Sequence, residues 1–182
     1  MSTAPALAQE VVEFWRQAGP ERWFASNASF DLNFKTRFLE THHAAARGEH
    51  AHWLDSADGA FALVLLLDQF PRNAFRGSGH AFATDGLALV YARAALEAGH
   101  DQAVDPSLRA FFYMPFEHAE APDEQARAVA LFEALGDAKS LQYAHAHQQV
   151  IARFGRFPHR NAALGRTTTA EEQAWLDAGG GF

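Results

Sequence analysis

The sequence of 182 residues contains no cysteine, which excludes disulfide bonds and thiolate metal sites and fits a reducing compartment. Long apolar runs are also missing: the longest, Ala60 to Leu67, is about a third of a membrane span. The first ten residues lack a basic segment followed by an apolar run, so no secretory signal is predicted. We therefore expect a soluble, cytoplasmic protein that does not enter a membrane.

Basic residues are scarce relative to acidic ones. Fifteen Lys and Arg stand against 22 Asp and Glu, which gives a formal net charge of −7. Non-specific nucleic-acid binding requires a broad basic surface, so a nucleic-acid partner is not expected. One segment departs from this balance, because Arg153 to Arg166 contains four arginines and no Asp or Glu.

No run of alternating apolar and polar residues is long enough to predict a strand. Instead, helical patterns follow one another and are separated by Gly and Pro. The content of sixteen Phe and four Trp favours a core built from large aromatic side chains, and no low-complexity linker divides the chain. We predict an all-α protein, a compact single domain over residues 1–182 built as a bundle of antiparallel helix pairs, with about eight or nine helices.

Individual helix boundaries can be predicted from capping residues and proline. Asp58 to Phe70 is apolar nearly all round, which predicts the central, most buried helix, and Pro71 is expected to end it. Asp137 to Phe154 reads as a long helix that begins at an aspartate cap. Thr169 and Glu172 have the spacing of a capping box before a last short helix.

A polar turn occurs twice in the chain. The first turn, Phe70-Pro71-Arg72-Asn73, recurs as the second turn, Phe157-Pro158-His159-Arg160-Asn161. The planar fork of arginine matches a carboxylate or phosphate, and asparagine offers both a donor and an acceptor, so two such turns are able to cradle an anion. In an alternative interpretation, the same side chains cap backbone carbonyls at helix ends. The sequence leaves both interpretations open.

Asp68 precedes the first turn on a helix face that is otherwise apolar, between Val64 and Leu65. We expect its carboxylate to be buried and therefore paired, because an isolated buried charge is costly. The available partners are arginines: Arg72, Arg76, Arg156 and Arg160. Such a pair either locks the turn after the helix or orients an arginine toward a ligand.

Histidines are the remaining candidates for acid–base or metal-ligand roles. His147 falls on an apolar helix face, which predicts a half-buried ring with a hydrogen-bond partner, as either a core histidine or a base near neutral pH. His118 and Glu120 follow Pro115, where a helix is expected to break. With His147 and His159 they include the ligand types of zinc, but no HExxH motif supports a site, so neither a metal nor a cofactor is predicted. The other histidines are expected at the surface or in loops: His42, His43, His50, His52, His80 and His100.

Several longer segments resemble a known bacterial family. They are "VVEFW", "LLLDQFPRNAFRG", "AFATD", "HAE", "LFEALGD" and "IARFGRFPHRNAALGR". In these the chain resembles the family catalogued as domain of unknown function 924, assigned to the tetratricopeptide-like helical superfamily. The resemblance implies a compact bundle of antiparallel helix pairs and no particular reaction. It also implies a shared polar set: Asp68, Arg72, Asn73, Asp85, His118, Glu120, Arg156, His159, Arg160 and Asn161. Ala119 departs from the expected serine.

Three functional hypotheses follow. The first is a binding protein for a small anionic molecule or a peptide carboxylate, with a ligand-binding set of Asp68, Arg72, Asn73, His147, Arg156, Arg160 and Asn161. The second is an enzyme, a hydrolase or lyase acting on an anionic metabolite, in which His118 or His159 is the general acid or base and Glu120 or Asp68 orients it. The third is a protein-interaction scaffold with an exposed aromatic patch drawn from Trp15, Trp23, Phe24 and Trp53. The oligomeric state is left open, a homodimer included.

Overall fold

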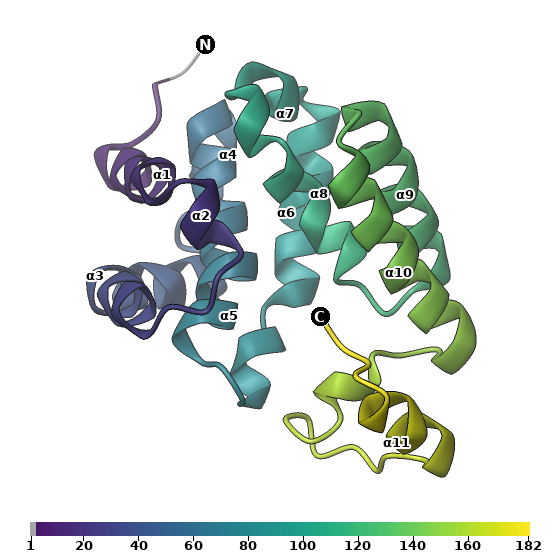
Figure 1. The fold of residues 1–182 in the computed structure, drawn as a ribbon. Helices are drawn as coiled ribbons and strands as arrows, with labels where there is room; N and C mark the ends of the chain where they lie inside the picture. The colour runs from purple at the N-terminus through teal and green to yellow at the C-terminus, as the bar shows by residue number, and fades with distance from the viewer. Residues whose placement is uncertain (1–2) are drawn as a thin grey trace. The chain divides into compact units, whose positions relative to one another are not determined.

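The computed structural model describes residues 3–182, and within that range every regular element is a helix (Figure 1). In chain order they are α1 (Ala6–Ala18), α2 (Pro20–Trp23), α3 (Ala28–Ala46), η1 (Ala51–Asp55), α4 (Ala57–Val64), η2 (Leu65–Gln69), α5 (Phe70–Ala74), η3 (Gly79–Phe82), α6 (Asp85–Glu97), α7 (His100–Ala103), η4 (Pro106–Leu108), α8 (Ala110–Glu117), α9 (Pro122–Leu135), α10 (Ala138–Phe154), η5 (Pro158–Arg160) and α11 (Ala170–Asp177). The protein is all-α, as predicted. None of the helices in the described range is both long and apolar enough to cross a membrane.

The capping residues identified in the sequence begin the expected helices. The Asp137 side chain accepts from the backbone N–H groups of Lys139 and Ser140 at the start of α10. Thr169 and Glu172 form the predicted capping box of α11. The short helices α2 and α7 have four residues each, too few to produce a readable apolar period, and the sequence pattern does not reveal them.

Contacts within the chain define two units. The first unit comprises the residues up to Arg76 together with His80–Pro115, and the second comprises Gly77–Gly79 together with Phe116–Phe182. The first turn belongs to the first unit and the second turn to the second. Whether residues 1–182 fold as one cooperative domain stays a prediction.

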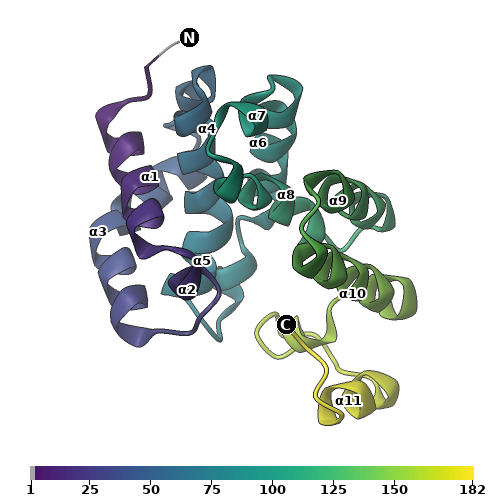
Figure 2. The same ribbon diagram turned by 45° about the horizontal axis from the view of Figure 1, so that its top comes forward.

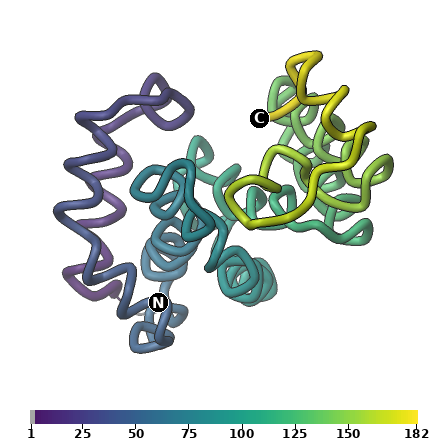
Figure 3. Tube along the Cα trace, turned by 90° about the horizontal axis from the view of Figure 1, so that it is seen from below, coloured from purple at the N-terminus to yellow at the C-terminus, as the bar shows by residue number. Residues whose placement is uncertain are grey.

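Aromatic side chains form the core of the first unit. Figure 3 shows α1 and α3 side by side, and the Phe14 ring on α1 stacks on Phe30 and Phe34 of α3 at centroid distances of 5.3 and 5.1 Å. Trp15 and Trp53 are buried in the same unit, as is Trp23. The hypothesis of an exposed patch of these tryptophans is therefore wrong, because the core requires their large apolar surfaces.

The central helix is buried as predicted, but it does not end at Pro71. Leu63 to Leu67 are completely buried, and the helical backbone continues from α4 through a π-helical turn, η2, into α5. In this turn the Phe70 N–H donates to the Leu65 carbonyl, five residues back. A proline ring clashes with the carbonyl four residues before it in a regular α-helix, and the wider π-turn relieves that clash. Pro71 then occupies the first turn of α5, where its missing N–H is tolerated.

The second unit is built on the hairpin of α9 and α10, which lie side by side (Figure 2). Gly136 joins them with a φ of 78°, the left-handed conformation that glycine adopts without strain. The apolar face of α10 contributes Val150 and Ile151 to a core that also contains Phe157 of the second turn. Phe157 therefore anchors the second turn in the core of its unit.

Candidate functional site

The π-turn leaves backbone carbonyls that side chains satisfy. Because the Phe70 N–H bonds to Leu65 and Pro71 has no N–H, the Leu66 carbonyl has no helical donor, and His42 Nδ1 approaches it at 2.8 Å. In a regular α-helix the Leu67 carbonyl would accept from the N–H of residue 71, but Pro71 has none. This carbonyl accepts instead from the Thr84 hydroxyl at 2.5 Å. Two polar side chains, His42 of α3 and Thr84 just before α6, therefore bond to the segment that leads into the first turn.

Asp68 is completely buried and paired with an arginine, as the sequence predicts. Arg72 Nη1 lies 3.3 Å from Asp68 Oδ1 and also donates to the Asp68 backbone carbonyl at 2.8 Å. The same guanidinium forms a two-pronged pair with Asp85, at 2.7 and 2.9 Å. Gln69 donates to the other Asp68 oxygen at 2.7 Å. Arg72 therefore joins two carboxylates within the first unit.

Asn73 and Arg76 hold the first turn against α3. The Asn73 amide donates to Asp31 Oδ1 at 2.7 Å, and Arg76 Nε donates to Asp31 Oδ2 at 2.7 Å. Asp31 lies in the first turn of α3, where a carboxylate also interacts favourably with the helix dipole. These contacts join the first turn to the beginning of α3.

In the second unit, Arg156 and Asn161 converge on Glu172. Arg156 forms a two-pronged pair with Glu172 at 2.6 and 2.9 Å, and the Asn161 amide lies 3.3 Å from Glu172 Oε2. The hydrogen bonds from Arg156, followed by that from the Thr169 N–H, lower the pKa of Glu172 to about 2. Glu172 thus serves both as a member of the capping box and as the buried anchor of this group.

Glu120 joins the second turn to Arg166. Its carboxylate accepts from the Phe157 N–H at 2.7 Å and from both terminal nitrogens of Arg166 at 2.8 and 3.0 Å. Burial acts to raise the pKa of Glu120, but the hydrogen bonds from Arg166 and Phe157 outweigh it and hold the pKa below its usual value. Glu120 is therefore an ionised positioning group for the backbone of the second turn.

Three of the candidate residues surround the buried Phe157 ring. The His147 ring meets it edge-on at 5.5 Å, His159 lies at 5.7 Å, and the Arg160 guanidinium lies 4.5 Å over its face. The His118 ring is 6.3 Å from that of His147. The structure thus gathers four predicted residues in one unit: His118, His147, His159 and Arg160.

His147 has the predicted hydrogen-bond partner, but it is buried, not half-buried as the sequence predicts. Its Nδ1 is 2.9 Å from the Tyr143 carbonyl and 3.1 Å from Glu117 Oε1, and its side chain is 9% exposed. Because a carbonyl only accepts, Nδ1 carries the proton and Nε2 offers the lone pair in the neutral ring. His145, two residues earlier on α10, is exposed.

The segment after α11 runs back to this group (Figure 2). The Phe182 ring stacks on His147 with a centroid distance of 3.6 Å and an angle of 15°, although Phe182 itself is 51% exposed. Gly180 lies flat against the Trp175 indole, where an added Cβ would come within 2.3 Å of the ring. Together with α10 and Trp175, residues 179–182 line a cavity of about 280 Å³.

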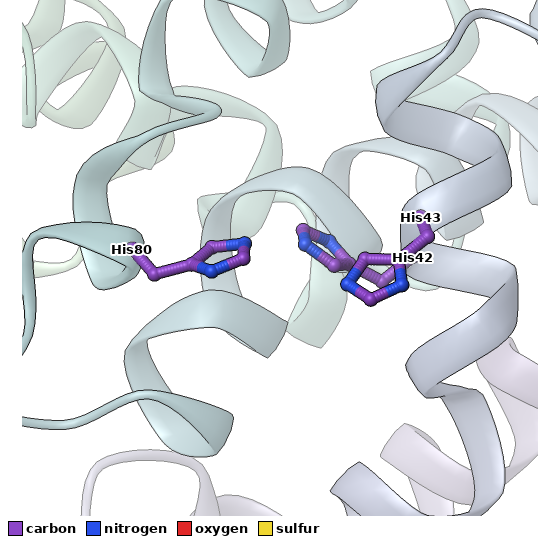
Figure 4. A group of neighbouring side chains, drawn as sticks. All are labelled: His42, His43 and His80. Atoms are coloured by element: carbon purple, nitrogen blue, oxygen red, sulfur yellow. The ribbon is translucent and has the colours of Figure 1, made fainter.

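A second cluster, which the sequence does not predict, lies in the first unit. His42 and His43 of α3 and His80 of η3 each offer a ring nitrogen, and these atoms lie within 4.8 Å of one another (Figure 4). The assignment of His42 to the surface is wrong, because its ring is completely buried. Burial, reduced by the hydrogen bond to Leu66 and reinforced by His43 and His80, holds the pKa of His42 below its usual value. Spacing along the sequence does not reveal this cluster, because His80 comes from a distant segment.

Comparison with known proteins places these residues in a family. The model of a family described as bacterial proteins of unknown function, DUF924, matches residues 11–180. The chain belongs to the DUF924 family. A solved structure described as a protein of unknown function from Agrobacterium tumefaciens is 51% identical, with a TM-score of 0.92 over 95% of this chain and 98% of the other. A search of curated proteins finds no match.

Membership in DUF924 agrees with the resemblance seen in the sequence, and the neighbour supports the helical fold. The polar set implied by that resemblance divides between the two units of the DUF924 chain. Asp68, Arg72, Asn73 and Asp85 lie in the first unit, and the remaining residues of the set lie in the second. Their roles in ligand binding or catalysis stay predictions.

Proposed function

We propose that this DUF924 protein binds a small anionic ligand or peptide carboxylate that carries an aromatic group, at the largely buried cluster of the second unit formed by His147, Phe157, His159 and Arg160. The stacking of Phe182 on His147 at 3.6 Å is the observation that carries this proposal. It identifies a place where an aromatic ring packs against a histidine beside a cationic side chain. A ligand ring would occupy the position of the Phe182 ring.

The apolar part of the proposed site consists of aromatic rings packed around Phe157. Phe157 is completely buried, and its ring contacts both His147 and His159. Phe182 also meets the Phe157 ring edge-on at 6.2 Å and the His159 ring at 5.8 Å. Three rings thus surround one aromatic side chain, and aromatic pairs of these kinds contribute about 0.5–1.5 kcal/mol each beyond their burial.

The positive charge of the proposed site comes from Arg160, supported by His159. The Arg160 guanidinium remains charged at any physiological pH and His159 adds positive charge when protonated, whereas a protonated His147 would pair with Glu117, 3.1 Å away. Glu120 forms its two-pronged pair with Arg166 in the same unit. This arrangement favours a ligand that presents a carboxylate or phosphate to Arg160 and a ring to His147.

Exchange of Phe182 for a ligand is consistent with the exposure and composition of the segment that carries it. Half of the Phe182 surface is exposed, and the three preceding residues are glycines. Glycine restricts a chain least, so the segment can leave its position without strain in its own backbone. The proposed site uses residues of the second unit, and Arg72 of the first turn joins Asp68 and Asp85.

Binding of N-acetylglycylphenylalanine, measured by isothermal titration calorimetry, tests the proposal, with its carboxamide as the uncharged comparison. The carboxylate should bind at least about tenfold more tightly than the amide, as expected for a charge-assisted hydrogen bond. Phe182→Ala should strengthen binding by removing the competing ring. His147→Ala should weaken it, and His145→Ala, on the same helix but exposed, is the matched control.

Arg160→Gln separates a ligand-binding role from a structural one. We expect loss of carboxylate binding with a thermal unfolding midpoint close to that of the unmodified protein. A collapse of the midpoint would make Arg160 a structural residue. Equal affinity for the carboxylate and the amide, or equal effects of His147→Ala and His145→Ala, would contradict the proposed site.

A further inference from the structure

The cluster of His42, His43 and His80 lies in the first unit and shares no residue with the proposed anion site. Figure 4 shows the His80 ring extending from the opposite side toward the rings of the two α3 histidines. One ring nitrogen from each residue lies within 4.8 Å of the others. In zinc sites the metal–nitrogen distance is about 2.0–2.1 Å, so modest side-chain rotation brings three such atoms onto one ion.

The tautomer of His42 suits a metal ligand. A backbone carbonyl only accepts, so Nδ1 carries the proton that it donates to Leu66, and Nε2 carries the lone pair. Nε2 is buried and has no hydrogen-bond partner among the described residues. Buried polar atoms are normally satisfied, and a histidine that donates one N–H to a carbonyl while its other nitrogen binds an ion is the usual arrangement at metal centres.

Two aromatic side chains of the segment that carries the first turn pack against the rings of His42 and His80. Phe70 stacks on His42 at 4.9 Å and 25°, and Phe75 stacks on His80 at 4.0 Å and 10°. Rings held by packing lose less conformational entropy when they bind an ion. The same segment supplies the Leu66 carbonyl that sets the His42 tautomer.

We propose that His42, His43 and His80 bind one divalent transition-metal ion, of which zinc is the reference case. Imidazole suits zinc, copper, iron and nickel, whereas magnesium and calcium prefer oxygen ligands. His42 is buried, His43 is half-buried and His80 is exposed, so solvent reaches one side of the cluster. Three neutral ligands leave the double charge of the ion in place and a coordination position for water or an anion.

Titration of the full-length, metal-free protein with Zn²⁺, followed by calorimetry, tests the proposal. One ion per chain should bind, and Co²⁺ in its place should give the intense visible absorption of a four-coordinate site. His80→Ala and His43→Ala should each weaken Zn²⁺ binding by at least about tenfold, since loss of even an indirect contact to a ligand costs about 10–100-fold. His52→Ala, an exposed histidine on η1 of the same unit, is the matched control and should bind normally.

His42→Ala is not the primary test, because it also opens the core and removes the partner of Leu66. The exposed His80 avoids this difficulty. Circular dichroism of each metal-free variant should match that of the unmodified protein. Absence of Zn²⁺ binding by the unmodified protein would overturn the proposal, as would binding that both His43→Ala and His80→Ala retain. Equal weakening by His52→Ala would do the same.

Discussion

His42 Nδ1 donates to the backbone carbonyl of Leu66 over 2.8 Å, and this bond joins η2, the segment that precedes the first turn, to the histidine cluster. The carbonyl lacks a helical donor because a π-turn precedes Pro71. A proline in the sequence therefore determines, through the backbone it requires, which nitrogen of a buried histidine carries the proton. The histidine cluster and the π-turn are therefore coupled through this bond.

Thr84→Val tests the capping of the π-turn. The substitution keeps the shape of the side chain but leaves the Leu67 carbonyl without the Thr84 hydroxyl. We expect a loss of about 1–2 kcal/mol in the free energy of unfolding, measured by urea denaturation. Thr36→Val, at an exposed position of α3, should change it by less than about 0.5 kcal/mol. Equal effects at the two positions would contradict the role assigned to Thr84.

Arg72→Leu tests the buried pair with Asp68. It removes the Arg72 guanidinium from a completely buried carboxylate and also breaks the pair with Asp85, so the protein should lose about 3–5 kcal/mol of stability. Arg47→Leu is the control, because Arg47 and Glu49 are both more than half exposed, and pairs of that kind contribute about 0–1 kcal/mol. A small loss at Arg72 would mean that Asp68 does not need its arginine.

Stability should depend on pH through Glu172. Its pKa is about 2 in the folded protein and its ordinary value is 4.5, so the folded state favours the ionised form. The stabilising contribution is therefore complete above pH 4.5 and is lost as the pH falls through about 2. The difference in urea midpoint between the unmodified protein and Glu172→Gln should shrink over that interval.

Glu171→Gln is the matched control for this pH series. Glu171 is the preceding residue on α11, but its side chain is 64% exposed in its pair with Arg153. Its substitution should change the urea midpoint little at any pH, since exposed pairs contribute little. A Glu172 difference that stays constant down to pH 2 would show that the pairing with Arg156 does not stabilise the ionised group.

Gly180→Ala should displace the segment that carries Phe182. A Cβ at this position would come within 2.3 Å of the Trp175 ring, so either the indole or the segment has to move. We expect a change in Trp175 fluorescence and loss of the ring-current shifts on the His147 protons in the NMR spectrum. Gly86→Ala, where an added Cβ meets nothing within 4 Å, should leave both signals unchanged. Retention of the His147 shifts in Gly180→Ala would contradict the proposed packing.

Local patterns in the sequence were sufficient for much of the fold. Asp137, Thr169 and Glu172 cap helices as predicted, because capping depends on residues two or three positions apart. The burial of Asp68 and its pairing with an arginine were also predicted, but the sequence left four arginines open as the partner, and the structure shows the pair with Arg72. The continuation of the helix past Pro71 was not, because the compensating partners of the carbonyls come from Thr84 and His42.

The candidate sites also divide into features that the sequence predicts and features that only the structure shows. Composition and periodicity by themselves determined an all-α chain with an aromatic core, because apolar burial follows the helical period. Only the tertiary structure decided which side chains meet: His43 with His80, Arg156 with Glu172, and Phe182 with His147. These contacts join segments that are far apart along the chain, and their geometry depends on how helices pack, which spacing within one helix does not specify.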